Sequence, residues 1–90
     1  MNTNTKDLEK KLKALANTRR LAILKYLKQK NRTFVGDISR QIKTSIKATS
    51  KHLAILFAAD IVDREQTGAF IAYSLSDNQN AVVEKVLDLI

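Results

Sequence analysis

Three side chains near the middle of the chain have the types and spacing needed to bind a phosphate or a base edge. Lys47, Ser50 and Lys51 are three and four residues apart, so on an α-helix they share one face. Ammonium groups donate charge-assisted hydrogen bonds to phosphate or to O6 and N7 of guanine, and a serine hydroxyl can do either. Small neighbours such as Ala48 keep this face slim enough to enter a groove.

Most other chemistries are excluded by composition. The 90 residues include no cysteine and one histidine, His52, so thiol redox chemistry, thiolate zinc sites and multi-histidine metal sites within one chain are ruled out. We find no glycine-rich phosphate loop and no nucleophile–base pair, so we expect neither an enzyme nor a cofactor. For His52 two interpretations stay open: a contact to phosphate or base, or a hydrogen-bonded structural histidine packed against the hairpin described below.

The charge of the chain is concentrated in its first half. Residues 1–51 carry 14 basic and three acidic side chains, a net charge of +11, whereas residues 52–90 carry two basic and six acidic ones, a net charge of −4. Such a basic half suggests a polyanionic partner, either nucleic acid or an anionic membrane surface, while a solvated lysine-rich surface remains the alternative that charge alone does not reject. No apolar run is long enough for a membrane span or a secretory signal, so we expect a cytoplasmic protein without a membrane partner.

The pattern of apolar residues predicts one domain over residues 1–90, with a loose tail at Met1–Asn4 and four helices before Asp60. A leucine stripe at Leu8, Leu12 and Leu15 marks the first helix, over 5–16, with Lys6, Lys10, Lys11 and Lys13 on its surface. Asn17 or Thr18 caps the second helix, which ends near 30–32. Thr33 is the predicted N-cap of the third, and Thr44 or Ser45 caps a fourth over 46–59. On a helical wheel the core side of this fourth helix spans roughly 100° and contains Ile46, Thr49, Leu53, Leu56 and Phe57.

After Asp60 the period changes to that of strands. Residues 61–66 and 70–75 are rich in β-branched and aromatic residues, and Gly68 between them suits a tight hairpin turn. Arg64 and Gln66 lie on the first strand, either touching a partner or facing solvent. Asp77 or Asn78 caps a last helix over 78–90, whose carboxylates Glu84 and Asp88, with Asp77, form either a solvated face or a hard-cation site.

This order predicts a mainly α fold with a small β-hairpin, the winged helix-turn-helix (ααααββα). Two helices joined by a tight turn over 34–58 would place the fourth helix in the major groove of DNA, and the hairpin, or wing, over 61–75 would reach an adjacent groove. The predicted DNA-binding residues are Thr44, Ser45, Lys47, Ala48, Ser50, Lys51, His52, Arg64 and Gln66.

Four segments, in the same order, resemble the ArsR-type winged-helix repressors. They are ALANTRRLAIL from Ala14, VGDISRQI from Val35, SIKATSKHL from Ser45, and the wing REQTGAFIAYSL, with Gly68, Phe70 and Tyr73. The resemblance covers roughly residues 8–76.

The resemblance implies a homodimeric, sequence-specific regulator of double-stranded DNA, usually a repressor. Its first and last helices, 5–16 and 78–90, would form the dimer interface, and the broad apolar face of the last helix agrees with this independently. The predicted interface residues are Leu8, Leu12, Val82, Val83, Val86, Leu87 and Ile90.

Several positions depart from the family pattern. Phe34 and Gly36 stand where metal-sensing members have Cys-x-Cys, and the last helix has no histidine. Lys43 and Asp60 replace usual glycines, and Thr18 a usual proline. We therefore expect no metal site, and control by protein abundance, by a protein partner or by an unidentified organic effector. The alternative function is a winged-helix adaptor that binds another protein, although an adaptor has no need for a slim basic helix face.

Overall fold

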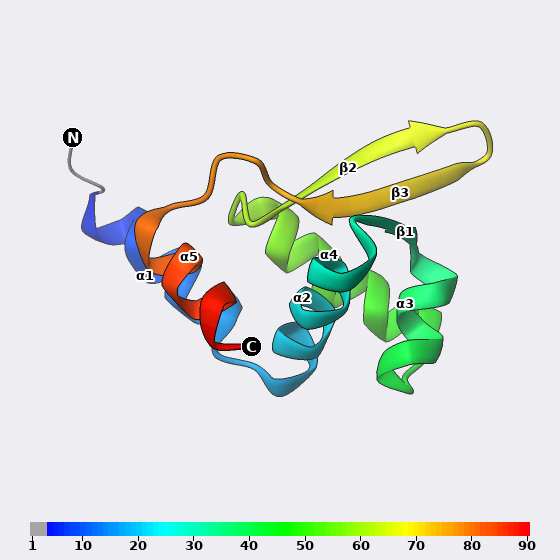
Figure 1. Ribbon diagram of the computed structural model, residues 1–90, viewed down its shortest axis with the longest axis horizontal. Coiled ribbons are helices and arrows are strands. Elements are labelled where there is room, and N and C mark those ends of the chain that lie inside the picture. Colours follow the sequence, from blue (N-terminus) through cyan, green and yellow to red (C-terminus); the bar gives the residue numbers. More distant parts are fainter. Residues whose placement is uncertain (1–3) are drawn as a thin grey trace.

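Five helices and three strands follow one another in the computed structural model, which describes residues 4–90 (Figure 1). The helices are α1 (Thr5–Leu15), α2 (Thr18–Lys30), α3 (Val35–Ile42), α4 (Ile46–Ala58) and α5 (Ala81–Leu89), and the strands are β1 (Arg32–Phe34), β2 (Val62–Thr67) and β3 (Phe70–Leu75). This order confirms the predicted mainly helical fold with a wing, and it adds one strand. Of the predicted tail, residues 1–3 lie outside the described part, and Asn4 is the N-cap of α1.

Side-chain caps set where the helices begin. Asn17 and Ser45 accept hydrogen bonds from the backbone N–H groups of Arg20 and Ala48, and each is one of the two alternatives that the sequence left open. The prediction for the last helix was wrong: its N-cap is Asn80 rather than Asp77 or Asn78, so α5 starts at Ala81.

The additional strand corrects the prediction for Thr33. Instead of capping α3, Thr33 lies in β1 and pairs with Tyr73 of β3, because a β-branched residue gains a sheet partner there. Phe34 precedes α3 without a side-chain cap. The sheet is antiparallel with the order β1-β3-β2, so β3 lies between the strand that leads into α3 and the strand that follows α4.

Two non-glycine residues hold left-handed conformations where the family usually has glycine. Lys43 ends α3 with φ 57° and Asp60 follows α4 with φ 61°. In both turns the next residue donates to a carbonyl five residues back, Thr44 to Ser39 and Ile61 to Leu56. This is the hydrogen-bond pattern of a Schellman C-cap, so both turns form without glycine.

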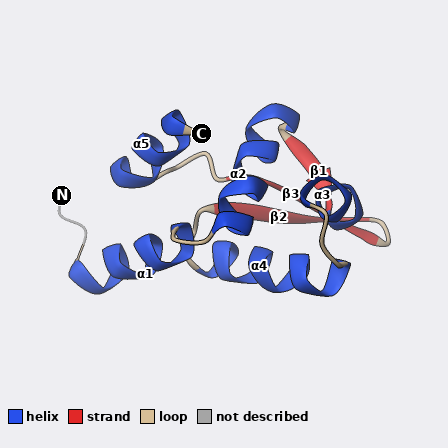
Figure 2. Ribbon diagram, turned by 90° about the horizontal axis from the view of Figure 1, so that it is seen from below, coloured by secondary structure: helices blue, strands red, loops and turns tan. Residues whose placement is uncertain are grey.

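The molecule is elongated, 38 × 26 × 21 Å. In both views α1 and α5 lie at one end, α2 runs through the middle, and α3 and the tip of the wing lie at the other end (Figure 2). The two helices expected to meet a partner are therefore far from the wing tip.

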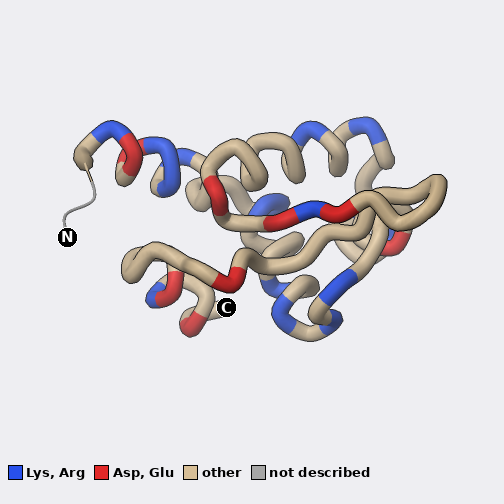
Figure 3. The backbone as a smooth tube through the Cα atoms, turned by 90° about the horizontal axis from the view of Figure 1, so that it is seen from above, with Lys and Arg blue, Asp and Glu red and all other residues tan. Residues whose placement is uncertain are grey.

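Basic residues gather on α1, α2 and the N-terminal half of α4, and acidic ones on β2 and α5 (Figure 3). Four of these cations cap helix C-termini, where backbone carbonyls lack partners and the helix dipole is negative. The donor and acceptor pairs are Arg20 with Lys13 and Ala14 in α1, Arg19 with Ile42 and Lys43 at the end of α3, Lys11 with Ala59 at the end of α4, and Lys28 with Leu87 and Ile90 at the end of α5. Lys11, predicted to be a surface residue, is only 7% exposed.

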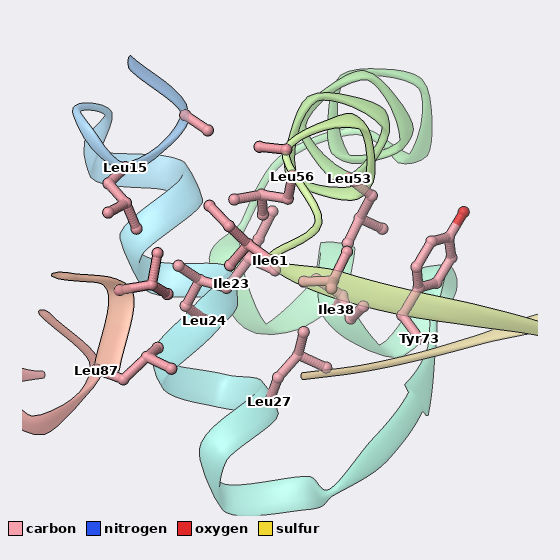
Figure 4. Packing of buried hydrophobic residues seen from close by; sticks show 14 residues of the cluster. Leu15, Ile23, Leu24, Leu27, Ile38, Leu53, Leu56, Ile61, Tyr73 and Leu87 are labelled. Carbon is pink, nitrogen blue, oxygen red and sulfur yellow. The ribbon is translucent and has the colours of Figure 1, made fainter. Parts of the chain in front are cut away.

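The apolar core lies between α2, α4 and the sheet (Figure 4). Ile23 and Leu24 of α2 and Leu53 and Leu56 of α4 are completely buried. Ile46, predicted on the core side of α4, is 56% exposed instead. Burial on α4 begins at Thr49, so its first turn lies past the edge of the core.

We expect Lys11→Met to lower the free energy of unfolding by about 1.5–3 kcal/mol, because it removes a buried hydrogen bond from a charged donor to the end of α4. Lys13→Met is the matched control: Lys13 is exposed, its one ion pair within residues 4–90 is with Glu9 on the same helix, and its removal costs about 0.5 kcal/mol or less. Urea denaturation at one protomer concentration measures both. Equal destabilisation by the two variants would show that Lys11 does not hold α4.

Candidate nucleic-acid interface

The free face of α4 carries the residues that the sequence singled out. Lys47, Ser50 and Lys51 are all exposed, while Ala48 is half-buried beside them. The helix has no acidic residue, and none of the four ion pairs found within residues 4–90 involves Lys47 or Lys51. The charges of both lysines are therefore available to an outside anion.

The opposite face of α4 fixes the direction in which these side chains point. Thr49, Leu53 and Leu56 are completely buried, and the Thr49 Oγ1 hydroxyl donates to the Ser45 carbonyl at 2.8 Å. Of the two predicted turn residues, Ser45 uses its Oγ to cap the helix, and Thr44 is half-buried in the turn. The turn itself is held from outside by the Arg19 guanidinium, 3.3 Å from the Ile42 carbonyl.

His52 makes a polar contact with Arg20 of α2, a partner that the sequence did not single out. Nη1 of Arg20 lies 3.3 Å from Nδ1 of His52. Because arginine only donates, Nδ1 must accept, so the ring is neutral and its proton is on Nε2. Partial burial, and secondarily the charges of Arg20 and Arg19, lower the pKa of His52 below 6.5. A neutral ring on the edge of α4 can donate one hydrogen bond through Nε2.

The two wing residues have different surroundings. The Arg64 guanidinium stacks over the Phe57 ring of α4, 3.9 Å from its centroid, which places a cation of β2 next to α4. Gln66 lies nearer the wing tip, and its Nε2 donates to the Gly68 carbonyl at 2.7 Å. Arg64 therefore lies close to α4, whereas one of the two side-chain N–H groups of Gln66 is used within the hairpin turn.

Sequence reasoning missed three residues of this region: Arg19, Arg20 and Ile46. Both arginines are in the segment that resembles the family, but nothing in the local pattern shows that their guanidinium groups reach α3 and α4. Ile46 fitted the apolar arc of α4, and only its tertiary surroundings show that it is exposed.

Two absences hold for residues 4–90. No three residues of the types His, Cys, Asp or Glu are grouped so as to hold a metal ion, and this includes Asp77, Glu84 and Asp88. Over the same residues, no helix has the length and apolar character needed to cross a membrane.

Known proteins match this chain along most of its length. It is 35% identical over 71 residues to the arsenical resistance operon repressor of Bacillus subtilis, which covers 79% of this chain and 68% of the relative. It is 38% identical over 74 residues to the transcriptional activator HlyU of Vibrio cholerae, and this match covers 81% of this chain and 68% of HlyU.

Solved structures agree with these sequence matches. HlyU of Vibrio cholerae superposes with a TM-score of 0.80 at 34% identity, over 99% of this chain and 92% of that chain. A homodimeric winged helix-turn-helix DNA-binding domain of Mycobacterium bovis, fragment 1–100, gives a TM-score of 0.80 at 26% identity, over 93% of this chain and 74% of that chain.

The family model for bacterial regulatory proteins of the arsR family matches residues 17–64, from the N-cap of α2 to Arg64 of the wing. Together with the relatives above, this match confirms the resemblance stated from the sequence. The chain belongs to the arsR family of bacterial transcription regulators, which bind double-stranded DNA through a winged helix-turn-helix.

Proposed function

We propose that the chain binds an inverted repeat in double-stranded DNA as a homodimer and represses transcription from the site it covers. The observation that supports this most is the pair of lysines on α4, exposed and unpaired within residues 4–90, on a helix whose other face is locked in the core. A helix of this kind enters the major groove, where Lys47 and Lys51 meet guanine or phosphate. An adaptor that binds proteins would not need this slim cationic face.

The remaining predicted residues fit around that helix. In our proposal Thr44 and Ser45 contact phosphate at the start of α4, and Ala48 allows close approach. Ser50 reads a base, His52 donates from Nε2, and Arg64 contacts the DNA backbone from β2. Gln66 has a smaller part, because one of its two side-chain N–H groups is used in the wing turn.

Residues for the dimer interface lie at the other end of the molecule. On α5, Val82 and Leu89 are exposed and Val86 and Ile90 are half-buried, and together they form one apolar face; Leu12 of α1 is exposed at the same end. Val83 and Leu87 must be removed from the predicted interface, because both are buried in the core of the protomer. Leu8 is half-buried and stays at the edge of the proposed surface.

Control of this binding would not use a thiolate site, because the chain has no cysteine. This distinguishes it from any regulator that binds a soft metal or arsenite through cysteines. We infer that the effector is an organic ligand or a protein partner. We place the protein in the cytoplasm, because a bacterial regulator acts where the DNA lies. We assign it no enzymatic step.

The Leu89→Asp variant should be a folded monomer at micromolar concentration, whereas the wild-type chain should be a dimer. Leu89 is 82% exposed, so the fold does not need it, but a carboxylate there would be desolvated in the interface. Gln41→Asp adds the same charge at an exposed position of α3 and should remain dimeric. Sedimentation velocity decides: a monomeric wild-type chain, or a dimeric Leu89→Asp, would contradict the proposed interface.

Alanine at Lys47 or Lys51 should weaken binding to a duplex selected from a random pool by about tenfold. Where the lysine binds a phosphate, its removal should also lower the slope of log affinity against log salt by about 0.9, hence by about 1.8 for two protomers. Lys30→Ala, at an exposed lysine at the end of α2, is the matched control and should change neither. If Lys30→Ala weakens binding as much as Lys47→Ala, the interaction depends on overall charge and not on α4.

The stability of the fold should depend on the protonation of His52. The folded pKa lies below 6.5 and the unfolded pKa near 6.5, so the unfolded chain binds a proton first as the pH falls. The contribution of neutral His52 to the free energy of unfolding is thus fully present above pH 6.5 and is lost as the pH falls below it. His52→Asn keeps an acceptor for Arg20 but does not titrate, so its free energy of unfolding should fall less than that of the wild type between about pH 7.5 and 5. Parallel curves from urea titrations would mean that the pKa of His52 is not lowered in the folded chain.

A further inference from the structure

An apolar groove of about 340 Å³ lies where the first turn of α4 meets β3 and the start of α3. Its walls are Phe34, Ile46, Phe70 and Ile71, all large and all exposed to solvent, and the Phe34 and Phe70 rings meet edge to face at 5.9 Å. Single exposed apolar residues are ordinary, but four around one groove mark a surface that binds something.

The fold itself does not account for Ile46. Its side chain lies outside the core cluster, and the start of α4 is already fixed by the Ser45 cap and by the buried Thr49. Ile46 therefore contributes little to the stability of the fold, and it lies in the first turn of α4 next to Lys47.

The charges around the groove favour DNA as its occupant. Lys47, which follows Ile46 in the sequence, has no ion pair within residues 4–90, and the one carboxylate in the lining of the groove, Asp37, is paired with Arg40 of the same lining. The groove is also continuous with the face of α4 proposed to enter the major groove. An apolar surface next to the unpaired cation Lys47 suits the largest apolar group that the major groove offers, the C5-methyl of thymine.

We propose that Ile46 determines specificity by contacting a thymine methyl group, against the wall formed by Phe34 and Phe70. This proposal rests on the proposed function and adds the base that the first turn of α4 reads. An aliphatic side chain cannot hydrogen-bond to a base edge, so it discriminates through the methyl group alone.

The test uses deoxyuridine, which pairs as thymidine does but lacks the methyl group. A duplex is first selected from a random pool with the full wild-type chain, and each thymine is then replaced by uracil, singly but symmetrically in both half-sites. We expect replacement at one position to weaken wild-type binding about fourfold per half-site, the value of one buried methyl group. Ile46→Ala should bind the thymine and uracil duplexes equally at that position.

Ile55→Ala is the matched control, because Ile55 is also an exposed isoleucine of α4 but lies outside the groove. It should keep the full preference for thymine. Two results would contradict the proposed methyl contact: an Ile46→Ala variant that still prefers thymine, or a wild-type chain whose affinity no replacement changes. In either case a protein partner would be the occupant of the groove. If the wild-type chain enriches no sequence, the proposed function fails, and this inference with it.

Discussion

The arrangement of this domain depends on cations from α1 and α2 that cap the C-termini of other helices. The side chain of Lys11 caps the C-terminus of α4. Those of Arg19, Arg20 and Lys28 cap the C-termini of α3, α1 and α5 in turn. Each capping group satisfies carbonyl oxygens that the helix leaves without partners, and each also opposes the negative end of a helix dipole. Because three of the four come from α2, this helix sets the positions of its neighbours as well as filling the core.

This division of roles among basic residues bears directly on the interface. Arg19 holds the turn before α4, Arg20 contacts His52 in its middle, and Lys11 holds its end, so the helix is fixed along its length before any partner binds. A helix ordered in advance loses less conformational entropy on binding. Lys47 and Lys51 can then act on the partner alone. The positive half of the sequence thus combines internal capping groups with an external binding face, which net charge by itself does not separate.

Sequence reasoning reached the fold because it depends on local signals. The apolar period, the caps at Asn17 and Ser45 and the glycine at position 68 are all readable within a few residues. The N-cap of α5 is a local error, because Asn80 accepts from Val82 only two residues away. The other errors share one physical cause, which is that the deciding partner is distant in sequence. Lys11 is buried by a carbonyl 48 residues away, and Thr33 joins a strand that begins at Phe70. Val83 and Val86 belong to one apolar face of α5, and only the packing separates the buried residue from the one left for a partner.

The relatives include both a repressor and an activator, so the same fold serves either outcome and α4 alone does not determine which. We propose that two copies of α4 enter the major groove of one duplex, and methylation interference detects this arrangement. Dimethyl sulfate modifies guanine at N7 in the major groove and adenine at N3 in the minor groove. On a selected duplex we expect interference at guanine N7 in two symmetric clusters, one helical turn of about 10 base pairs or a multiple of it apart. A single cluster, or interference at adenine N3 alone, would contradict this account.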